Sequence, residues 1–461
     1  MTEISTELIK QAIYQLCFNA NTCLNEDIYL KLLNAYKNAA NKEEKNILKS
    51  IIQNAQIAYE KKLPLCQDTG QVIVFLQIGQ NIRLTGEYIE TCINEAVEKC
   101  YMDNYFRKSV VYNAVFDRTN TKTNAPAIIY IKYIPEDEIR IKVLIKGAGS
   151  ENKSGLKMLL PTANEEDIIQ SVGNIILAAG ENACPPMSIG IGIGGTAEKA
   201  CLMSKEALLK ENLSDDELTL GRKIKEYVNK NAPETYKSSY VLDVKVMTCA
   251  AHIACMPAAV TINCHSERYS TCTIDKSGII IHHQIPFFIQ LNNESENKKE
   301  INVKDTETIR ALKQGEEFLL TGDIYVARDM AHKRINELIK ENRKLPFDLE
   351  NNIIFYAGPC PSGDDRVIGS IGPTTASRMD KYAVDFYNKG LLATIGKGTR
   401  SKEVEKAIKQ NGAKYFTITG GIAALLADKV KKSSIIAFED LGTEAVYKIY
   451  VEKFPLKVTI A

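Results

Sequence analysis

The sequence predicts a mixed α/β fold in two domains, a larger N-terminal α+β domain and a smaller C-terminal α/β domain. The first sixty residues carry apolar side chains at helical spacing and lead into a strand rich in Val, Ile and Phe. A polar, charged stretch at 291–305 separates two apolar parts of the chain, and strand and helix patterns alternate after it. We therefore expect a domain at 1–288, a linker at 289–303 and a second domain at 304–461.

In the first domain, helical spacing predicts helices at 8–21, 27–40, 41–62 and 86–105. A turn at Pro64 and Gly70 precedes a strand at 71–79. Two further strands, 126–134 and 139–147, are expected to pair with each other. A helix at 196–209 has Thr196 as its predicted N-cap.

Two later segments of this domain, 240–250 and 258–266, are typical of strands. Their polar ends contain Cys and His, and we expect these ends to meet at a common edge.

In the second domain, strand patterns alternate with helix patterns. The expected strands are 316–327, 352–359, 391–398 and 415–421, and the expected helices are 328–342, 377–390, 402–412 and 422–430. Gly-rich turns follow several of these strands, which is where α/β domains usually bind ligands.

The composition is that of an ordinary soluble protein. The chain has 461 residues and a net charge of +1, which gives no reason to expect a nucleic-acid or membrane-surface partner. No run approaches the roughly 20 apolar residues of a membrane span, and the N-terminus lacks a signal-peptide core. We expect a cytoplasmic protein whose twelve cysteines stay reduced, most of them as small buried side chains.

Three cysteines stand in distinctive local contexts. Cys66 lies in LPLCQDTGQ, Cys184 in ENACPPMSIGIGIGG and Cys264 in AVTINCHSER. Three thiolates brought together by a fold can hold three irons of a [4Fe-4S] cluster and leave the fourth iron open as a Lewis acid. The alternatives are three unrelated core thiols, or a binding or electron-transfer protein whose cluster has a fourth ligand such as Cys255 or Cys360.

A glycine-rich run gives the main argument for a different class, an NAD-dependent oxidoreductase. The run GIGIGG fits G-x-G-x-x-G and a predicted helix follows it; the matching residues are Gly190, Gly192 and Gly195. However, Pro185 and Pro186 interrupt the strand that should precede such a loop. A lone match of this kind is weak support for a nucleotide site.

Six motifs occur in order along the chain: PLCQDTG, ACPPMSIGIGIGGTAEKA, NCHSER, ARDMAHKR, GPTTASRMD and IGKG. With them, the chain resembles the iron–sulfur-dependent (class I) fumarate hydratases and the related L-tartrate dehydratases over nearly its whole length. The resemblance implies that the family's α and β parts are fused here, as a cluster-binding domain and a swivelling-type domain. It also implies a homodimer that acts on a small dicarboxylate in the tricarboxylic acid cycle.

The resemblance assigns roles to individual residues. It implies Cys66, Cys184 and Cys264 as cluster ligands and Thr374 and Asp68 as catalytic residues. The implied substrate-binding residues are Gln67, Arg107, Gly149, His252, Arg328, Arg378 and Lys397.

Chemistry supports the cations independently, because a dicarboxylate needs fixed positive charge and Arg offers planar, two-donor recognition. The simpler alternatives are that the arginines are solvated surface charges, that Asp68 only forms a turn ahead of Gly70, and that His252 is a core side chain. Three of the cations belong to the second domain and the cluster ligands to the first, so we expect a site between the domains.

The predicted function is the reversible hydration of fumarate to (S)-malate by a hydro-lyase. Thr374 would remove the C3 proton with Asp68 as its acid–base partner. Departures from the family pattern, including Ala148 where Gly is usual, lie around the substrate. L-tartrate dehydratase and mesaconate hydratase activities therefore stay open as alternatives within the family.

Overall fold

The computed structural model describes residues 2–180, 183–291 and 298–461. The fold is mixed α/β, so the predicted fold class is confirmed. The chain divides into two compact units, unit 1 (Met1–Ile289) and unit 2 (Gln290–Ala461). Of the predicted linker 289–303, residues 292–297 lie outside the described residues, and Lys299–Asn302 forms strand β12.

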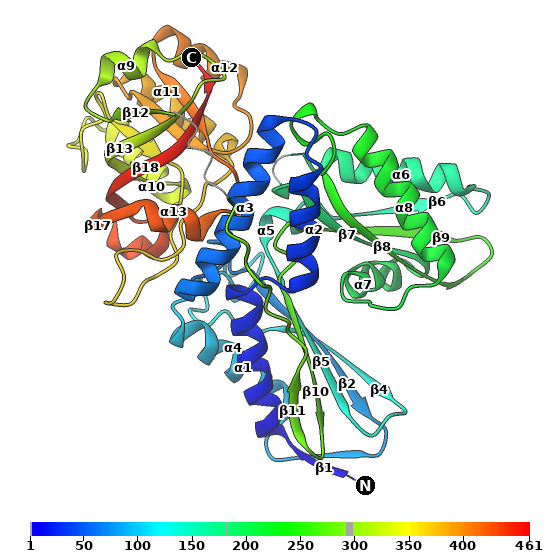
Figure 1. The fold of residues 1–461 in the computed structure, drawn as a ribbon. Helices are drawn as coiled ribbons and strands as arrows, with labels where there is room; N and C mark the ends of the chain where they lie inside the picture. Colours follow the sequence, from blue (N-terminus) through cyan, green and yellow to red (C-terminus); the bar gives the residue numbers. More distant parts are fainter. Residues whose placement is uncertain (1, 181–182, 292–297) are drawn as a thin grey trace. The chain divides into compact units, whose positions relative to one another are not determined.

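The first part of unit 1 is a five-stranded sheet covered by helices (Figure 1). The strand order is β11 (Gly278–Ile281), β10 (Tyr269–Asp275), β5 (Ile139–Lys146), β2 (Gln71–Gly79) and β4 (Ile128–Ile134). The helices of this part are α1 (Thr6–Thr22), α2 (Glu26–Lys37), α3 (Lys42–Lys61) and α4 (Ile89–Asp103). Helices α1 and α4 bury their apolar stripes against this sheet, and two short strands, β1 (Thr2–Ser5) and β3 (Ile82–Thr85), pair beside it.

One predicted strand pairing is wrong. Strands β4 and β5 exist as expected, but β2 lies between them, pairing parallel with β4 and antiparallel with β5. The reason is burial: β2 is apolar along most of its length, with Val72 to Leu76 buried, and an apolar strand is most stable in the middle of a sheet. Alternating patterns identify strands but carry no information on which strands are neighbours.

The second part of unit 1 is a four-stranded sheet. Its order is β6 (Gly155–Leu159), β9 (Met256–Cys264), β7 (Met187–Gly195) and β8 (Val241–Ala251). The helices packed on it are α6 (Glu165–Ala178), α7 (Ala197–Leu208) and α8 (Asp215–Lys230), and the short helix α5 (Ala148–Glu151) contacts β9. Thr196 occupies the N-cap position of α7, but its hydroxyl bonds the Glu198 carboxylate at 2.5 Å rather than a backbone amide.

The glycine run lies inside strand β7 rather than in a loop between a strand and a helix. A Cβ atom on Gly190 would lie 2.0 Å from the Ser204 carbonyl oxygen, and one on Gly192 would lie 2.2 Å from that of Ala200. Both oxygens belong to α7, so the glycines allow α7 to pack closely against the strand. This packing role explains the motif and removes the structural basis for the dinucleotide-binding alternative.

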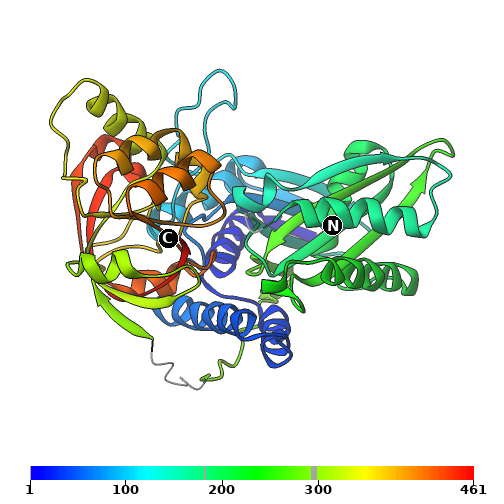
Figure 2. The ribbon, with the colours of Figure 1, turned by 90° about the horizontal axis from the view of Figure 1, so that it is seen from above.

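Unit 2 is built on a seven-stranded sheet with the order β12, β13 (Glu317–Val326), β14 (Ile353–Phe355), β15 (Ala393–Gly396), β16 (Lys414–Thr417), β18 (Val446–Ile460) and β17 (Val430–Ala437). The strands from β12 to β16 are parallel, and β18 pairs antiparallel with both β13 and β16. The helices are α9 (Thr306–Ala311), α10 (Asp329–Lys340), α11 (Asp380–Asn388), α12 (Lys402–Gln410) and α13 (Ala423–Lys429). Helices α11 and α12, drawn in orange, lie side by side (Figure 2).

The predicted alternation of strand and helix in unit 2 matches these elements. Strands β17 and β18 lie beyond the last predicted element, and β18 contains Pro455, a residue that usually argues against a strand interior. In the part of the chain that the structure describes, no helix is both long and apolar enough to cross a membrane.

Candidate active site

The cysteines singled out by their contexts lie at strand ends of unit 1. Cys264 is the last residue of β9 and pairs across from Met187, the first residue of β7. Cys184 lies three residues before Met187, and its carbonyl oxygen is 3.4 Å from Nδ1 of His265. The backbone pairing of β7 and β9 therefore brings Cys184 and Cys264, eighty residues apart, to one end of this sheet.

Cys66 lies five residues before β2 of the other sheet, and it is close enough to Cys264 for the two thiols to interact electrostatically. Burial raises the pKa of the Cys66 thiol to about 12, while the nearby Arg268 guanidinium opposes this and Cys264 reinforces it. Gln67 lies beside this thiol, with its Oε1 atom 3.4 Å from the Cys66 sulfur. All three cysteines are partly buried and outside any disulfide.

Arg268 is a buried cation that the sequence analysis did not select. Its side chain is 3% exposed, and Nη1 donates a 2.6 Å hydrogen bond to the backbone oxygen of Asp68. Burial lowers its pKa, but Cys66, Cys264 and Asp68 together raise that pKa above its usual value. A permanent positive charge thus lies close to Cys66 and Cys264. The sequence could have indicated this residue, since Arg268 is the last residue of the NCHSER motif.

The donor set, three cysteine thiols, has the ligand chemistry that an iron–sulfur cluster requires. Among the described residues, no three His, Cys, Asp or Glu side chains converge closely enough to hold one metal ion. A cluster core is larger than one ion, so its ligands stand further apart, and thiolates are the ligands it prefers. Cys264 at the end of β9, Cys184 just before its partner strand β7, and Arg268 close to Cys66 and Cys264 are compatible with that requirement.

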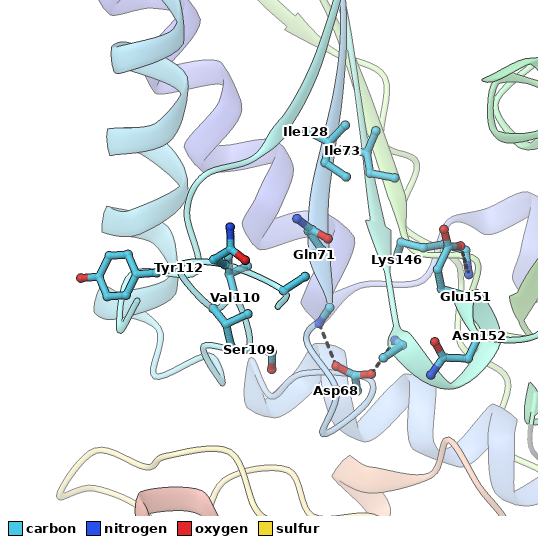
Figure 3. Close-up of a pocket in the computed structure, with 15 residues that line it drawn as sticks. Asp68, Gln71, Ile73, Ser109, Val110, Tyr112, Ile128, Lys146, Glu151 and Asn152 are labelled. Atoms are coloured by element: carbon cyan, nitrogen blue, oxygen red, sulfur yellow. Dashed lines mark hydrogen bonds and ion pairs between the residues drawn. The ribbon is translucent and has the colours of Figure 1, made fainter. Parts of the chain in front are cut away.

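Asp68 is fixed by several donors (Figure 3). Its carboxylate accepts hydrogen bonds from the amides of Ala148 at 2.9 Å and Gly70 at 3.2 Å, and from Nη2 of Arg107 at 3.2 Å. Burial raises the pKa of Asp68, but Arg107, Arg268 and the two amides outweigh it, so the pKa lies below its usual value. Asp68 is therefore an anion at neutral pH. The bond from the Gly70 amide is the one that the simpler turn interpretation requires.

A pocket of about 480 Å³ opens beside Asp68 (Figure 3). Lys146, the last residue of β5, lines it and is 4% exposed. Its ammonium donates to the Ser150 hydroxyl at 2.8 Å and the Ile262 oxygen at 2.7 Å, and it lies 3.3 Å from the Glu151 carboxylate. Burial lowers the pKa of Lys146 to about 8, against the opposing effect of Glu151.

Lys146 was not selected from the sequence, although it begins the KGAGSEN segment that contains the predicted Gly149. Gly149 is exposed and lies in α5, whose first residue is the Ala148 that holds Asp68. Asp68 and Lys146 thus line the pocket, Arg107 bonds Asp68, and Gly149 follows the Ala148 that also lines it.

His252 does not join this group within its own unit. It is exposed and lies between β8 and β9, before Met256, whereas Cys264 ends β9. Nine residues of extended strand span about 26 Å, because each of the eight steps advances about 3.3 Å. The expectation that the ends of the two segments meet at one edge is therefore wrong. Both strands flank β7, but β8 runs parallel and β9 antiparallel to it, so their carboxyl ends lie at opposite ends of the sheet.

The predicted residues of unit 2 gather at the carboxyl ends of its parallel strands. Arg328 follows β13 and is the N-cap residue of α10. Thr374 is buried, and its amide donates a 2.7 Å hydrogen bond to the backbone oxygen of Tyr356, the residue that follows β14. Lys397 follows β15, and its amide donates to the Thr374 oxygen at 3.2 Å. Arg378 lies in the short helix η3 (Ala376–Met379), where the amide of Ala376 bonds the Lys397 oxygen at 2.9 Å.

Two carboxylates that were not predicted accompany the two arginines. Nε of Arg378 donates to Oδ1 of Asp329 at 2.9 Å, and Nη2 of Arg378 donates to Oδ2. Nη2 of Arg328 donates to Glu444, whose other oxygen accepts from the Met330 amide at 2.9 Å. Asp329 adjoins Arg328 in the sequence, so its place beside the predicted cations could have been inferred from the motif. Glu444 lies more than a hundred residues from Arg328 in the chain, so nothing in the sequence indicated their pairing.

Two family models match this chain. The family model described as fumarate hydratase (fumerase) matches residues 10–273, and the model for the fumarase C-terminus matches residues 280–461. The chain is 30% identical to "Fumarate hydratase class I, anaerobic" of Escherichia coli K12, over 91% of this chain and 82% of that protein. It is also 30% identical to "Fumarate hydratase 2" of Leishmania major, over 91% of this chain and 79% of that protein.

A third relative covers one part of the chain. The "Putative L(+)-tartrate dehydratase subunit alpha" of Methanocaldococcus jannaschii is 38% identical over 56% of this chain and 95% of its own length. The two family models together span nearly the whole sequence, and the E. coli and Leishmania relatives extend across both units. The chain belongs to the class I fumarate hydratase family.

Proposed function

We propose that this chain, a lyase by its family, catalyses the reversible hydration of fumarate to (S)-malate. Cys66, Cys184 and Cys264 would hold a [4Fe-4S] cluster with one iron free of protein ligands. When bound, that iron supplies a Lewis acid for a substrate carboxylate and hydroxyl. The observation that carries the proposal is the position of Cys184 and Cys264 at paired strand ends, with Arg268 beside Cys66 and Cys264.

The charge balance in unit 1 suits a small dianion. Arg107 offsets Asp68, Lys146 and Lys205 share the single charge of Glu151, and Arg268 is left out of this count because it faces the cysteines. Positive charge is therefore left over for substrate carboxylates, which guanidinium groups bind with two parallel hydrogen bonds. Gln67 and Gly149 would complete the contacts from this unit.

The residues of unit 2 would supply the remaining charge and the base. Arg328, Arg378 and Lys397 would neutralise the carboxylate next to the carbon that loses its proton. Thr374 would take that C3 proton, with the ionised Asp68 as its acid–base partner, and cations close by would favour a deprotonated Thr374. The contribution of both units to one site stays a prediction, as do the role of His252, the homodimer and the cytoplasmic location.

L-tartrate dehydration is the second candidate. It is favoured by the higher identity, 38%, to the protein named as a putative tartrate dehydratase subunit. Initial rates with fumarate, (S)-malate, L-tartrate and mesaconate would rank the substrates. A kcat/KM for L-tartrate above that for fumarate would reverse the assignment.

The direct test is to purify the chain without oxygen, measure iron and sulfide, and follow fumarate consumption before and after exposure to air. We expect activity that depends on the cluster and is lost in air, because an iron without a protein ligand would be open to oxidants. Cys184→Ser should lower both iron content and activity, whereas Cys201→Ser, an exposed cysteine on α7, should change neither. Full activity in metal-free protein would exclude the proposed mechanism.

A further inference from the structure

The carboxylate of Asp329 lies next to Arg328 and Arg378, the two arginines of unit 2 that were predicted to bind substrate. It accepts two hydrogen bonds from Arg378, through Nε and Nη2, and its Oδ2 atom is 3.7 Å from Nε of Arg328. Asp329 is the first residue of α10, so the helix fixes its backbone. One carboxylate therefore connects the two side chains that the proposed function assigns to substrate binding.

The geometry of the Arg378 pair leaves the arginine able to bind an anion. A guanidinium group has five N–H donors in a planar fork. Asp329 takes the edge formed by Nε and Nη2, and the edge formed by Nη1 and the second Nη2 hydrogen is not used by Asp329. A pair of this kind orients the guanidinium plane without blocking its second edge.

We propose that Asp329 is a positioning residue, which holds Arg378 so that its second edge faces the substrate carboxylate. This inference rests on the proposed function. The two arginines differ in their other support. Arg328 is 15% exposed and is also bound by Glu444, whereas the Arg378 side chain is 50% exposed. Loss of Asp329 should therefore act mainly through Arg378.

The test is the variant Asp329→Asn, which keeps the shape of the side chain and removes its charge. We expect KM for fumarate and for (S)-malate to rise about tenfold or more, with a smaller change in kcat, because binding contacts are lost. The increase in Tm that malate produces should shrink accordingly. Asp329→Glu, which restores the charge, should recover part of both effects.

The same helix offers a matched control. Arg334 of α10 donates two hydrogen bonds to Asp440, at 2.7 and 2.6 Å, in an exposed pair. Asp440→Asn removes an ion pair of the same kind and should leave KM unchanged. If Asp329→Asn behaves like Asp440→Asn, Asp329 has no positioning role. A fall in KM would also overturn the inference, because it would mean that Asp329 only competes with the substrate.

The measurement of ligand-induced Tm shifts separates this inference from the proposed function. If the wild-type protein does not hydrate fumarate, the proposed function fails, yet Tm shifts with malate, L-tartrate and mesaconate still compare the variants. A ligand-induced shift that is present in the wild type and reduced in Asp329→Asn supports the positioning role. If none of these dicarboxylates shifts the Tm of the wild type, the inference fails as well.

Discussion

Arg268 shows how one residue ties the candidate site of unit 1 together. Its guanidinium bonds the backbone of Asp68, lies 3.4 Å from the side-chain oxygen of Asn21, and is close to Cys66 and Cys264. A buried cation needs compensating anions, and Asp68 supplies a single negative charge that it shares between Arg268 and Arg107, so further negative charge is favoured beside Arg268. Thiolates in place of thiols would provide that charge. Cluster binding and the burial of Arg268 are therefore expected to stabilise each other.

We predict that Arg268→Leu lowers the iron and sulfide content per chain several-fold after anaerobic reconstitution, because metal ligands must be thiolates and the cation favours them. Arg140→Leu is the control, since Arg140 is a partly exposed, ion-paired arginine of β5 in the same unit. Far-UV circular dichroism would check that both variants fold. Normal iron content in folded Arg268→Leu protein would contradict the prediction.

The contact between β7 and α7 is the feature that matters most at the scale of elements. Alternate glycines along β7 let the backbone of α7 approach the strand, and β7 in turn carries the pairing that brings Cys184 and Cys264 to one end of the sheet. The same residues that resemble a nucleotide-binding loop therefore serve helix–strand packing. Any side chain on this face must push the helix away.

We predict that Gly192→Ala destabilises the protein by about 1–3 kcal/mol, the usual cost of overpacking a core. The added Cβ would lie 2.2 Å from the Ala200 oxygen, a backbone atom that cannot move without α7. Urea unfolding would measure the loss. Gly155→Ala is the control, because its Cβ meets only the Ile175 side chain, at 3.2 Å, and equal losses in both variants would refute this account.

At the scale of the whole molecule, the two units have separate hydrophobic cores. The clusters around α1, α4 and the five-stranded sheet, and around β7 with α6 and α8, belong to unit 1. The cluster around α10, α11 and α12 belongs to unit 2. A chain with separate cores can unfold in more than one step.

We predict that Phe386→Ala, in the core of unit 2, shifts one calorimetric transition and leaves another in place. Phe386 is fully buried and stacks on His332 with ring centroids 5.0 Å apart, and loss of such a ring costs about 3–5 kcal/mol. Ile141→Ala, in the core of unit 1, should shift the other transition. Equal shifts of the whole unfolding profile by both variants would show a single cooperative unit instead.

Much of the fold followed from local patterns, because the spacing of apolar residues records which side of an element is buried. That spacing predicted α1 to α4, β2 and the alternating elements of unit 2. The motifs also singled out the three cysteines and three cations of unit 2 as candidates, since their neighbours in the chain are part of the pattern, and their roles stay predictions.

Tertiary structure alone decided which elements are neighbours and which charges meet. The insertion of β2 between β4 and β5, the distance of His252 from Cys264, and the pairing of Arg328 with Glu444 all join or separate residues far apart in the chain. Sheet order, strand direction and ion pairs depend on how distant segments pack together. A periodicity that spans ten or twenty residues has no way to record them.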